Sequence, residues 1–315
     1  MNDTTSIEIR PARRRDTAAL VEFLRSAPPA PGTTHAADAA LLANLRNRIV
    51  AVGGRQVVGA CLVIRGAGRC AAIRPPRLLQ WDVHLAARLF RAAAAHARKK
   101  HHARLIQSLI EPSAADSLTP ALDRAAFEPL ATLSYLRRPV RGTDSAAGPA
   151  DREAKPLAPP VLTWQRFSRL SHRKFADTIA RTYADSLDCP KLAGLRTIDE
   201  VIETHKHTGR FTPRSWHLVL EGGRTVGVAM VNDLKGRGEL VYLGVAPEAR
   251  GRGIGRALLA RAIRDTAERG LTRMGLAVDT HNTPAIRLYE WAGFHEIHRR
   301  LAWFVPAERL DALGA

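Results

Sequence analysis

The chain carries one pattern twice, and this repetition limits its fold more than any other feature. Residues 49–64 read IVAVGGRQVVGACLVI, and residues 217–231 read HLVLEGGRTVGVAMV. In each segment an apolar run enters a Gly-Gly pair, which can supply the positive φ of a hairpin turn, and a second β-branched run leaves it. The motifs LDRAAF and YEWAGF then end twelve residues before Pro139 and Pro306. We therefore predict that one fold is duplicated.

A linker separates the two copies. The segment 139–160, PVRGTDSAAGPADREAKPLAPP, combines Pro, Gly, Ala and mixed charge without an apolar period, which is typical of a linker. A length of 315 residues also favours two domains. We predict domains at 1–140 and 161–315, joined by a linker at 141–160.

The second half can be followed element by element, and it predicts an α/β fold of the α+β kind, with one mixed sheet and helices on both faces. A capping box formed by Thr197 and Glu200 opens one helix, and Gly270 stops another. The predicted order is a strand at 161–164, a helix at 171–185, the helix after Thr197, the hairpin, a strand at 239–245, a helix at 254–269, a strand at 272–278, a helix at 283–291 and a strand at 295–304.

Composition excludes several classes of protein. The hydrophobic content of 45% indicates a globular chain. No apolar run reaches the roughly 20 residues that span a bilayer, and the first residues lack a signal-peptide core, so we expect a cytoplasmic protein without a membrane partner. The three cysteines are odd in number and lack CxxC spacing, so neither a disulfide framework nor a metal site is predicted.

The net charge of +18 brings nucleic acid into consideration as a partner. The arginines, however, are spread over all the predicted helices. The densest basic run, HARKKHHAR at 96–104, stands where a helix end would favour cations. Only 5% of residues are aromatic, so the interleaved aromatics of a nucleic-acid surface are missing, and the pattern disfavours nucleic acid.

The most informative stretch runs from 240 to 263, LVYLGVAPEARGRGIGRALLARAI. A strand ends at Val245, and Gly251, Gly253 and Gly255 then lead into an amphipathic helix. Without Cβ atoms, a ligand can approach the backbone, so that successive N–H groups at the helix start face an anion. A pyrophosphate fits such a turn, and the sequence differs from both the dinucleotide fingerprint and the P-loop.

This turn, V-x-P-x-x-R-G-x-G-x-G, and the later run N-T-P-A-x-x-L-Y-x-x-x-G-F from Asn282 resemble the GCN5-related N-acetyltransferase (GNAT) superfamily. The tandem arrangement is similar to the two-domain, mycothiol synthase type of acetyltransferase. The resemblance implies acetyl-CoA or another acyl-CoA as acyl donor, and direct transfer to an amine. It also implies two groups of cofactor-binding residues, with the pantetheine arm along Leu243, Gly244 and Val245 and the pyrophosphate at Arg250, Gly251, Arg252, Gly253, Ile254, Gly255 and Arg256.

Acyl transfer from a thioester to an amine needs a proton acceptor for the amine and a proton donor for the leaving thiolate. The resemblance places the hydroxyl of Tyr289 near the coenzyme sulfur as general acid, and a tyrosine pKa of about 10 suits this task. It places Glu239 as the base, with His281 and Asp279 as alternatives. Backbone amides near Val245 would polarise the thioester carbonyl.

Other residues have smaller predicted roles. Asn282 is expected to bond the pantetheine, to cap the following helix, or to do both. Cys189 lacks a His and acid arrangement for covalent catalysis, so its loop is expected to form part of the acceptor wall. In that loop Asp188 and Tyr183 are weaker candidates for recognising a cationic acceptor.

The first half lacks the cofactor turn. It contains no glycine between Gly68 and Gly142, Trp81 stands near the expected turn, and Leu122 occupies the position of Tyr289. We therefore predict that the N-terminal copy is degenerate, with Asp82 as a helix N-cap.

We thus expect an acyl-CoA-dependent N-acyltransferase with one working site in the C-terminal half. The alternatives left open are a non-catalytic CoA-binding or sensing module and an Arg-rich nucleic-acid-binding protein. The amine acceptor, the acyl length and the oligomeric state do not follow from the sequence.

Overall fold

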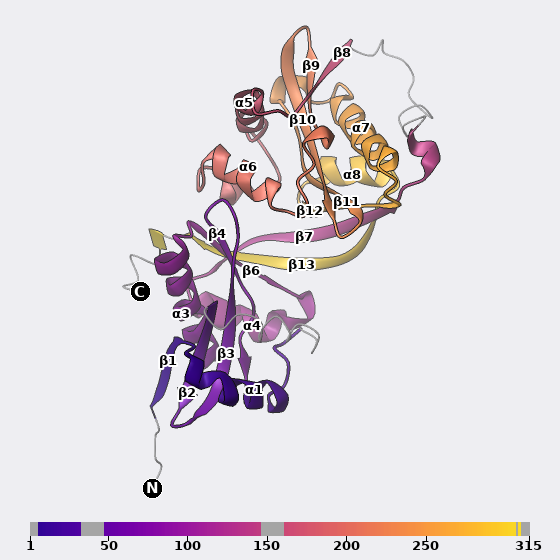
Figure 1. Cartoon of the computed structure of the whole chain (residues 1–315). Coiled ribbons are helices and arrows are strands. Elements are labelled where there is room, and N and C mark those ends of the chain that lie inside the picture. Colours follow the sequence, from indigo (N-terminus) through magenta and orange to yellow (C-terminus); the bar gives the residue numbers. More distant parts are fainter. Residues whose placement is uncertain (1–5, 33–46, 146–160, 307, 310–315) are drawn as a thin grey trace. The chain divides into compact units, whose positions relative to one another are not determined.

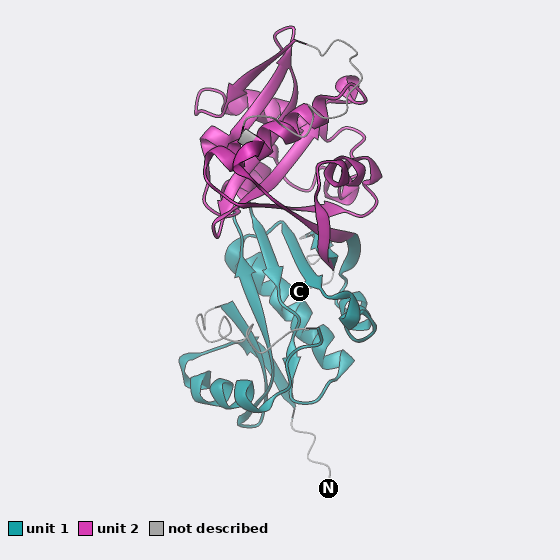
Figure 2. Cartoon of the chain, turned by 90° about the vertical axis from the view of Figure 1, so that its right-hand side faces the viewer, with its two compact units in different colours: residues 1–131, 300–315 teal, residues 132–299 magenta. Residues whose placement is uncertain are grey.

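The two Gly-Gly segments form hairpins at corresponding places in two separate units (Figure 1). The structure is a computed structural model, which describes residues 6–32, 47–145, 161–306 and 308–309. Unit 1 comprises residues 1–131 and 300–315, and unit 2 comprises residues 132–299 (Figure 2). Most of the predicted linker, residues 146–160, lies outside the described residues.

Unit 1 is a mixed sheet in the order β1-β2-β3-β4-β6-β13, with β5 paired to β3. Strands β4 and β6 run parallel, because helix α3 crosses between them, and the other neighbours are antiparallel. Helices α3 and α4 pack on one face, and α1 packs on the other. The elements are β1 (Ile7–Pro11), α1 (Thr17–Ser26), β2 (Arg48–Gly53), β3 (Gln56–Arg65), β4 (Cys70–Ile73), β5 (Arg77–Leu78), α3 (Val83–His101), β6 (Leu105–Ile110), α4 (Ala115–Arg124) and the end of β13 (His295–Pro306).

Unit 2 repeats this topology in the order β8-β9-β10-β11-β12-β7. Here β11 and β12 are the parallel pair, joined by α7. Helices α5 and α6 pack on one face, and α7 and α8 pack on the other. The elements are β7 (Glu128–Pro139), β8 (Leu162–Arg166), α5 (His172–Thr182), α6 (Ile198–Lys206), β9 (Trp216–Glu221), β10 (Arg224–Leu234), β11 (Arg237–Val245), α7 (Ile254–Glu268), β12 (Arg273–Asp279) and α8 (Thr283–Trp291).

The last strand of each unit comes from the other half of the sequence. β7 follows α4 of unit 1, but its residues 133–139 pair with β12 in unit 2, where Leu136 joins the core. β13 follows α8 of unit 2, but its residues 301–306 pair with β6 in unit 1, where Trp303 joins the core. The units therefore differ from the sequence-based domains at these two strands. The alternating pattern of a strand fixes its buried face and leaves open which sheet it joins.

The mixed α/β fold and its duplication agree with the sequence, and so do several local predictions. Thr197 caps α6 in a complete capping box with Glu200, and Gly270 follows α7 with a φ of +70°. Helix α8 has the predicted bounds. No helix in the described ranges is long and apolar enough to cross a bilayer.

The strand exchange predicts which unit each strand stabilises. Replacing Trp303 by Ala should lower the free energy of unfolding of unit 1 by about 3–5 kcal/mol, because this side chain fills its core. Replacing Leu136 by Ala should lower that of unit 2 by about 2–5 kcal/mol. Hydrogen exchange on the full chain measures both: Trp303→Ala should expose β6, and Leu136→Ala should expose β12. The reverse pattern would contradict the exchange.

Candidate functional site

The site begins where the parallel strands β11 and β12 separate. Their register pairs only Gly238 with Met274 and Glu239 with Gly275. Beyond that point the edge of β11 lines a cavity of about 210 Å³, with Ala277 on the other side. Because backbone N–H and C=O groups need partners, this edge offers hydrogen bonds to an extended ligand. The predicted pantetheine residues Leu243, Gly244 and Val245 all line the cavity.

The glycine turn has the open geometry that an anion site requires. Gly251 and Gly253 have φ values of +74° and +81°, and a Cβ added at either position would meet nothing within 4 Å. Gly253 is the N-cap of α7, and its carbonyl accepts the N–H of Ala257 at 3.1 Å. The preceding N–H groups of the first turn have no acceptor within the helix. They and the helix dipole form a site that suits a diphosphate.

The other two residues of the predicted turn have packing roles. A Cβ on Gly255 would lie 3.3 Å from Leu288 Cδ2, so the missing side chain lets α7 approach α8. Ile254 is buried against the core on the inner side of α7.

The guanidinium of Arg250 binds backbone carbonyls. Its Nη2 donates to the carbonyls of Thr182 at 3.2 Å and Ala184 at 2.6 Å, its Nη1 to that of Asp185 at 3.2 Å, and its Nε to that of Val245 at 3.2 Å. Four of its five N–H donors are thus in use. Arg250 therefore ties the end of α5 to the glycine turn. A side-chain bond from Arg250 to a pyrophosphate stays a prediction, with one N–H left for it.

Unit 1 contains a matching arginine clamp, that is, an arginine whose guanidinium binds several backbone carbonyls. Arg77 donates from Nε to the carbonyl of Pro28 at 2.7 Å, and from Nη2 to that of Leu24 at 2.9 Å and to that of Ala27. Leu24 lies in the last turn of α1 and the other two carbonyls follow that helix, just as three of the four carbonyls bound by Arg250 lie at or after the end of α5. Because the clamp is present in the copy without the glycine turn, holding the first helix is sufficient to explain it.

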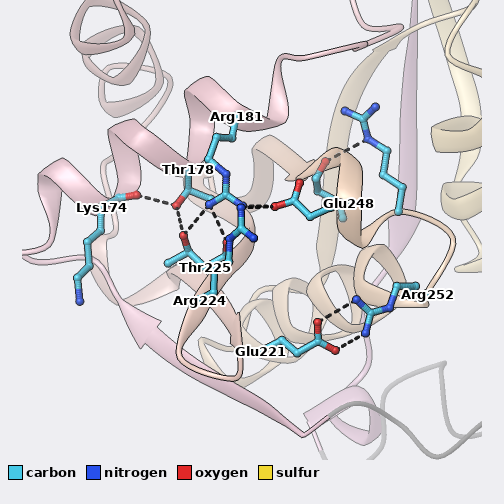
Figure 3. A network of polar contacts seen from close by, with 10 residues as sticks. Lys174, Thr178, Arg181, Glu221, Arg224, Thr225, Glu248 and Arg252 are labelled. Carbon is cyan, nitrogen blue, oxygen red and sulfur yellow. Dashed lines mark hydrogen bonds and ion pairs between the residues drawn. The ribbon is translucent and has the colours of Figure 1, made fainter.

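The other two arginines of the turn also have protein partners. Arg252 forms a two-bond ion pair with Glu221, with Nη1 at 2.9 Å from Oε2 (Figure 3). The guanidinium carbon of Arg256 lies 4.7 Å from the ring centroid of Trp291, a cation–π contact. The main-chain N–H groups are therefore the clearest candidates for holding a pyrophosphate.

Tyr289 faces the cavity from α8. The residue is only 7% exposed, lines the cavity, and makes no hydrogen bond through its hydroxyl within the described part of the chain. Burial and, second, the charge of Asp188 raise the pKa of Tyr289 above its usual value. The hydroxyl therefore stays protonated at neutral pH and can donate a proton.

Asn282 and Glu239 have different positions. Asn282 lines the cavity and caps α8, because its Oδ1 accepts the N–H of Ala285 at 3.3 Å. Glu239 pairs with Arg237, with Oε2 at 3.0 Å from Nε, and its neighbour Leu240 reaches the cavity instead. A catalytic role for Glu239 stays a prediction, and it would need a bridging water.

A second cavity, of about 430 Å³, adjoins the first. The loop between α5 and α6 forms most of its wall. That this loop contacts an acceptor stays a prediction. The two cavities share six residues, which are Tyr183, Asp185, Ser186, Asp188, Val241 and Tyr242. A pocket of this size takes the body of a small molecule.

Several side chains of the second cavity were not predicted. The loss of surrounding water, followed by the charge of Arg196, lowers the pKa of His205 to about 4, so the imidazole is neutral. The hydroxyl of Tyr242 lies 2.7 Å from Thr182 Oγ1. The alternation of β11 could have indicated Tyr242, whereas His205 lies in a polar helix segment without a distinguishing signal.

Among the remaining candidates, Asp279 binds the loop between α5 and α6. Asp279 is buried; its Oδ2 accepts the N–H of Cys189 at 3.2 Å, and its Oδ1 accepts the N–H of His281 at 3.0 Å. Burial raises the pKa of the Cys189 thiol to about 12, which keeps it protonated and argues against a nucleophilic role. The His281 side chain is 82% exposed and lies beside Asp279.

Unit 1 has the features of a degenerate copy. Asp82 caps α3, accepting the N–H groups of His84 at 2.7 Å and Leu85 at 3.3 Å, as predicted. Leu122, at the position of Tyr289, is fully buried in the core.

The comparisons with known proteins agree with this geometry. A model of the acetyltransferase (GNAT) family matches residues 180–294, which hold the turn, both separated strands and Tyr289. The C-terminal part of the chain therefore contains a region that matches the GNAT acetyltransferase family. A mycothiol acetyltransferase of Thermobifida fusca is 28% identical over 232 residues, 68% of each chain. A second one, from Streptomyces avermitilis, is 30% identical over 184 residues, covering 58% of this chain and 55% of that protein.

The fold similarity extends over both units of this acetyltransferase. A GCN5-related N-acetyltransferase from Sphaerobacter thermophilus matches 96% of each chain with a TM-score of 0.60 and 19% sequence identity. The family model, in contrast, matches only within the C-terminal part. The two findings together describe a two-unit fold in which one region, in the C-terminal part, matches the acetyltransferase family.

The turn predicts a difference between two glycines at opposite ends of α7. Gly253→Ala and Gly270→Ala each place a Cβ at a positive φ with open space around it, so both should lose about 1 kcal/mol of stability. Only Gly253→Ala should also weaken acetyl-CoA binding, by about tenfold or more, because its Cβ stands where the diphosphate approaches. Calorimetric titration measures both dissociation constants, and an unchanged value for Gly253→Ala would contradict the assignment.

Proposed function

We propose that unit 2 transfers an acetyl group from acetyl-CoA to a primary amine by direct attack in a ternary complex. The observation that carries this proposal is the open edge of β11, which starts where β12 leaves it and ends at the glycine turn. The diphosphate would bind the N–H groups at the start of α7. The pantetheine would extend the sheet along Leu243–Val245, and the thioester would lie deeper in the cavity.

The chain's own groups can perform the chemistry. Backbone N–H groups near Val245 would polarise the thioester carbonyl, which lowers the barrier to attack. The amine nitrogen forms a bond to the carbonyl carbon, the C–S bond breaks, and the Tyr289 hydroxyl gives its proton to the departing thiolate. Tyr289 then regains a proton from the attacking nitrogen, directly or through water.

The acceptor is an amine that fits the second cavity. Its side of the site includes the acceptor loop and the neutral His205. The curated relatives are named mycothiol acetyltransferases, so their acceptor amine is the first to test. A panel that also contains amino sugars, amino acid amides, peptides and simple alkylamines samples the other classes.

A thiol-release assay with acetyl-CoA tests the function directly. Free CoA and N-acetylated product should appear together for at least one amine, and mass spectrometry identifies the product. Binding of acetyl-CoA without release of thiol by any amine would instead favour a CoA-binding module.

The acid role of Tyr289 predicts a specific kinetic change. Tyr289→Phe should lower kcat by about 100-fold or more, because the leaving thiolate loses its proton donor. The dissociation constant of acetyl-CoA should stay unchanged, since phenylalanine fills the same buried space. Tyr135→Phe, in β7 of the same unit, is the matched control and should keep full activity. Equal loss of turnover and affinity in Tyr289→Phe would argue against the acid role.

A further inference from the structure

The wall between the two cavities contains a carboxylate with one oxygen unused. Asp188 lines both cavities. Its Oδ1 accepts the backbone N–H of Asp279 at 3.0 Å, which fixes the orientation of the group. Its Oδ2 has no hydrogen-bond or ionic partner within the described residues. This oxygen therefore remains for a ligand, at the boundary between the donor side and the acceptor side.

The other acidic groups nearby are less suited to meet an amine. The Asp279 carboxylate accepts hydrogen bonds from Cys189 and His281. Glu239 is paired with Arg237 and lines neither cavity. Asp185 also lines both cavities, but within the described residues no hydrogen bond or ion pair fixes its carboxylate as the Asp279 N–H fixes that of Asp188.

We propose that Asp188 binds the ammonium group of the acceptor and removes the proton that must leave before the nitrogen attacks. This inference rests on the proposed acetyl transfer and assigns to Asp188 the step that the family resemblance implied for Glu239. Asp188 and Tyr289 line the same cavity, so the proposed base and the proposed acid border one space.

The surroundings suit a group that alternates between charged and neutral forms. Loss of water and, among the charges, the nearby Asp279 carboxylate raise the pKa of Asp188 above its usual value. A carboxylate with a raised pKa is a stronger base toward an alkylammonium. An incoming ammonium also compensates a negative charge that is costly in this position.

The protons balance over the cycle. An alkylammonium loses one proton to Asp188, which later releases it to water. The resulting amine attacks the thioester, loses a second proton as the amide forms, and Tyr289 passes one proton to the thiolate. The products are the N-acetylated amine, CoA thiol and one proton released to solvent.

The test compares two acceptors of the same shape that differ in charge. An alkylamine such as 2-phenylethylamine is an ammonium ion at pH 7.5, whereas O-benzylhydroxylamine, with oxygen in place of the carbon beside nitrogen, is neutral. If another alkylamine of the thiol-release panel reacts faster than 2-phenylethylamine, that amine and its O-alkylhydroxylamine isostere are used instead. Only the charged acceptor needs a base before attack.

Asp188→Asn should lower kcat/KM for the alkylamine by about 100-fold and for the hydroxylamine by less than about threefold. The amide oxygen can still accept the Asp279 N–H, so the loop and the acetyl-CoA dissociation constant should not change. Asp188→Glu should recover part of the alkylamine activity. Asp177→Asn, which removes one exposed charge from the outer side of α5 (70% exposed), should behave as wild type.

Four results would overturn the proposal. Equal losses of activity with both acceptors in Asp188→Asn would indicate a structural role. Unchanged activity with both acceptors would show that Asp188 has no role in the reaction. Selective loss of alkylamine activity in Glu239→Gln, with Asp188→Asn unaffected, would return the base role to Glu239. A wild-type protein that acetylates no amine would overturn the acetyl-transfer function itself, and this inference with it.

Discussion

The separation of β11 from β12 after two residue pairs is the constraint on which the site depends. A parallel pair that stayed together would use the backbone groups of Leu243–Val245 within the sheet. Because the strands part, the same groups become a binding edge, and the space between them becomes the cavity. Tyr289, from α8, also lines this cavity. The proposed coenzyme site is thus a break in sheet pairing beside the end of a helix.

The duplicated topology shows which parts of this arrangement serve the fold and which serve the ligand. Both units keep the parallel pair joined by a helix, and both keep an arginine, Arg77 or Arg250, that binds carbonyls at and after the end of the first helix. Unit 1 lacks the glycines and has a buried leucine at the position of Tyr289. The clamp is therefore explained by stability, whereas the glycines and the tyrosine, which unit 1 lacks, are the residues to which we assign the proposed chemistry. The exchanged strands β7 and β13 give each half of the chain a part in the core of the other unit.

Much of the fold and part of the site could be predicted from the sequence, because the signals concerned are local. The Gly-Gly hairpins, the Thr197 capping box and the bounds of α8 depend on residues a few positions apart. The family motif placed the cofactor residues along the cavity wall and at the turn. The partners of Arg250, Arg252 and Arg256 could not be predicted. Most of these partners are far along the chain, and only the folded structure brings them close. The exchange of β7 and β13 was missed for the same reason, since the two strands have the same alternation and either sheet could bury them.

The acceptor side illustrates how a loop without regular structure can still carry a fixed side chain. Cys189 adopts a left-handed φ of +47°, a conformation that costs about 1 kcal/mol for a residue other than glycine. The Asp279 carboxylate accepts its N–H, and the Asp279 N–H in turn binds Asp188. These reciprocal bonds join the loop to the end of β12, and Arg250 joins the start of the same loop to the glycine turn. The loop is therefore attached at both ends to the elements that line the first cavity. Arg250 and the loop connect the glycine turn to Asp188 by one set of contacts, so the proposed donor and acceptor sites share their supporting structure.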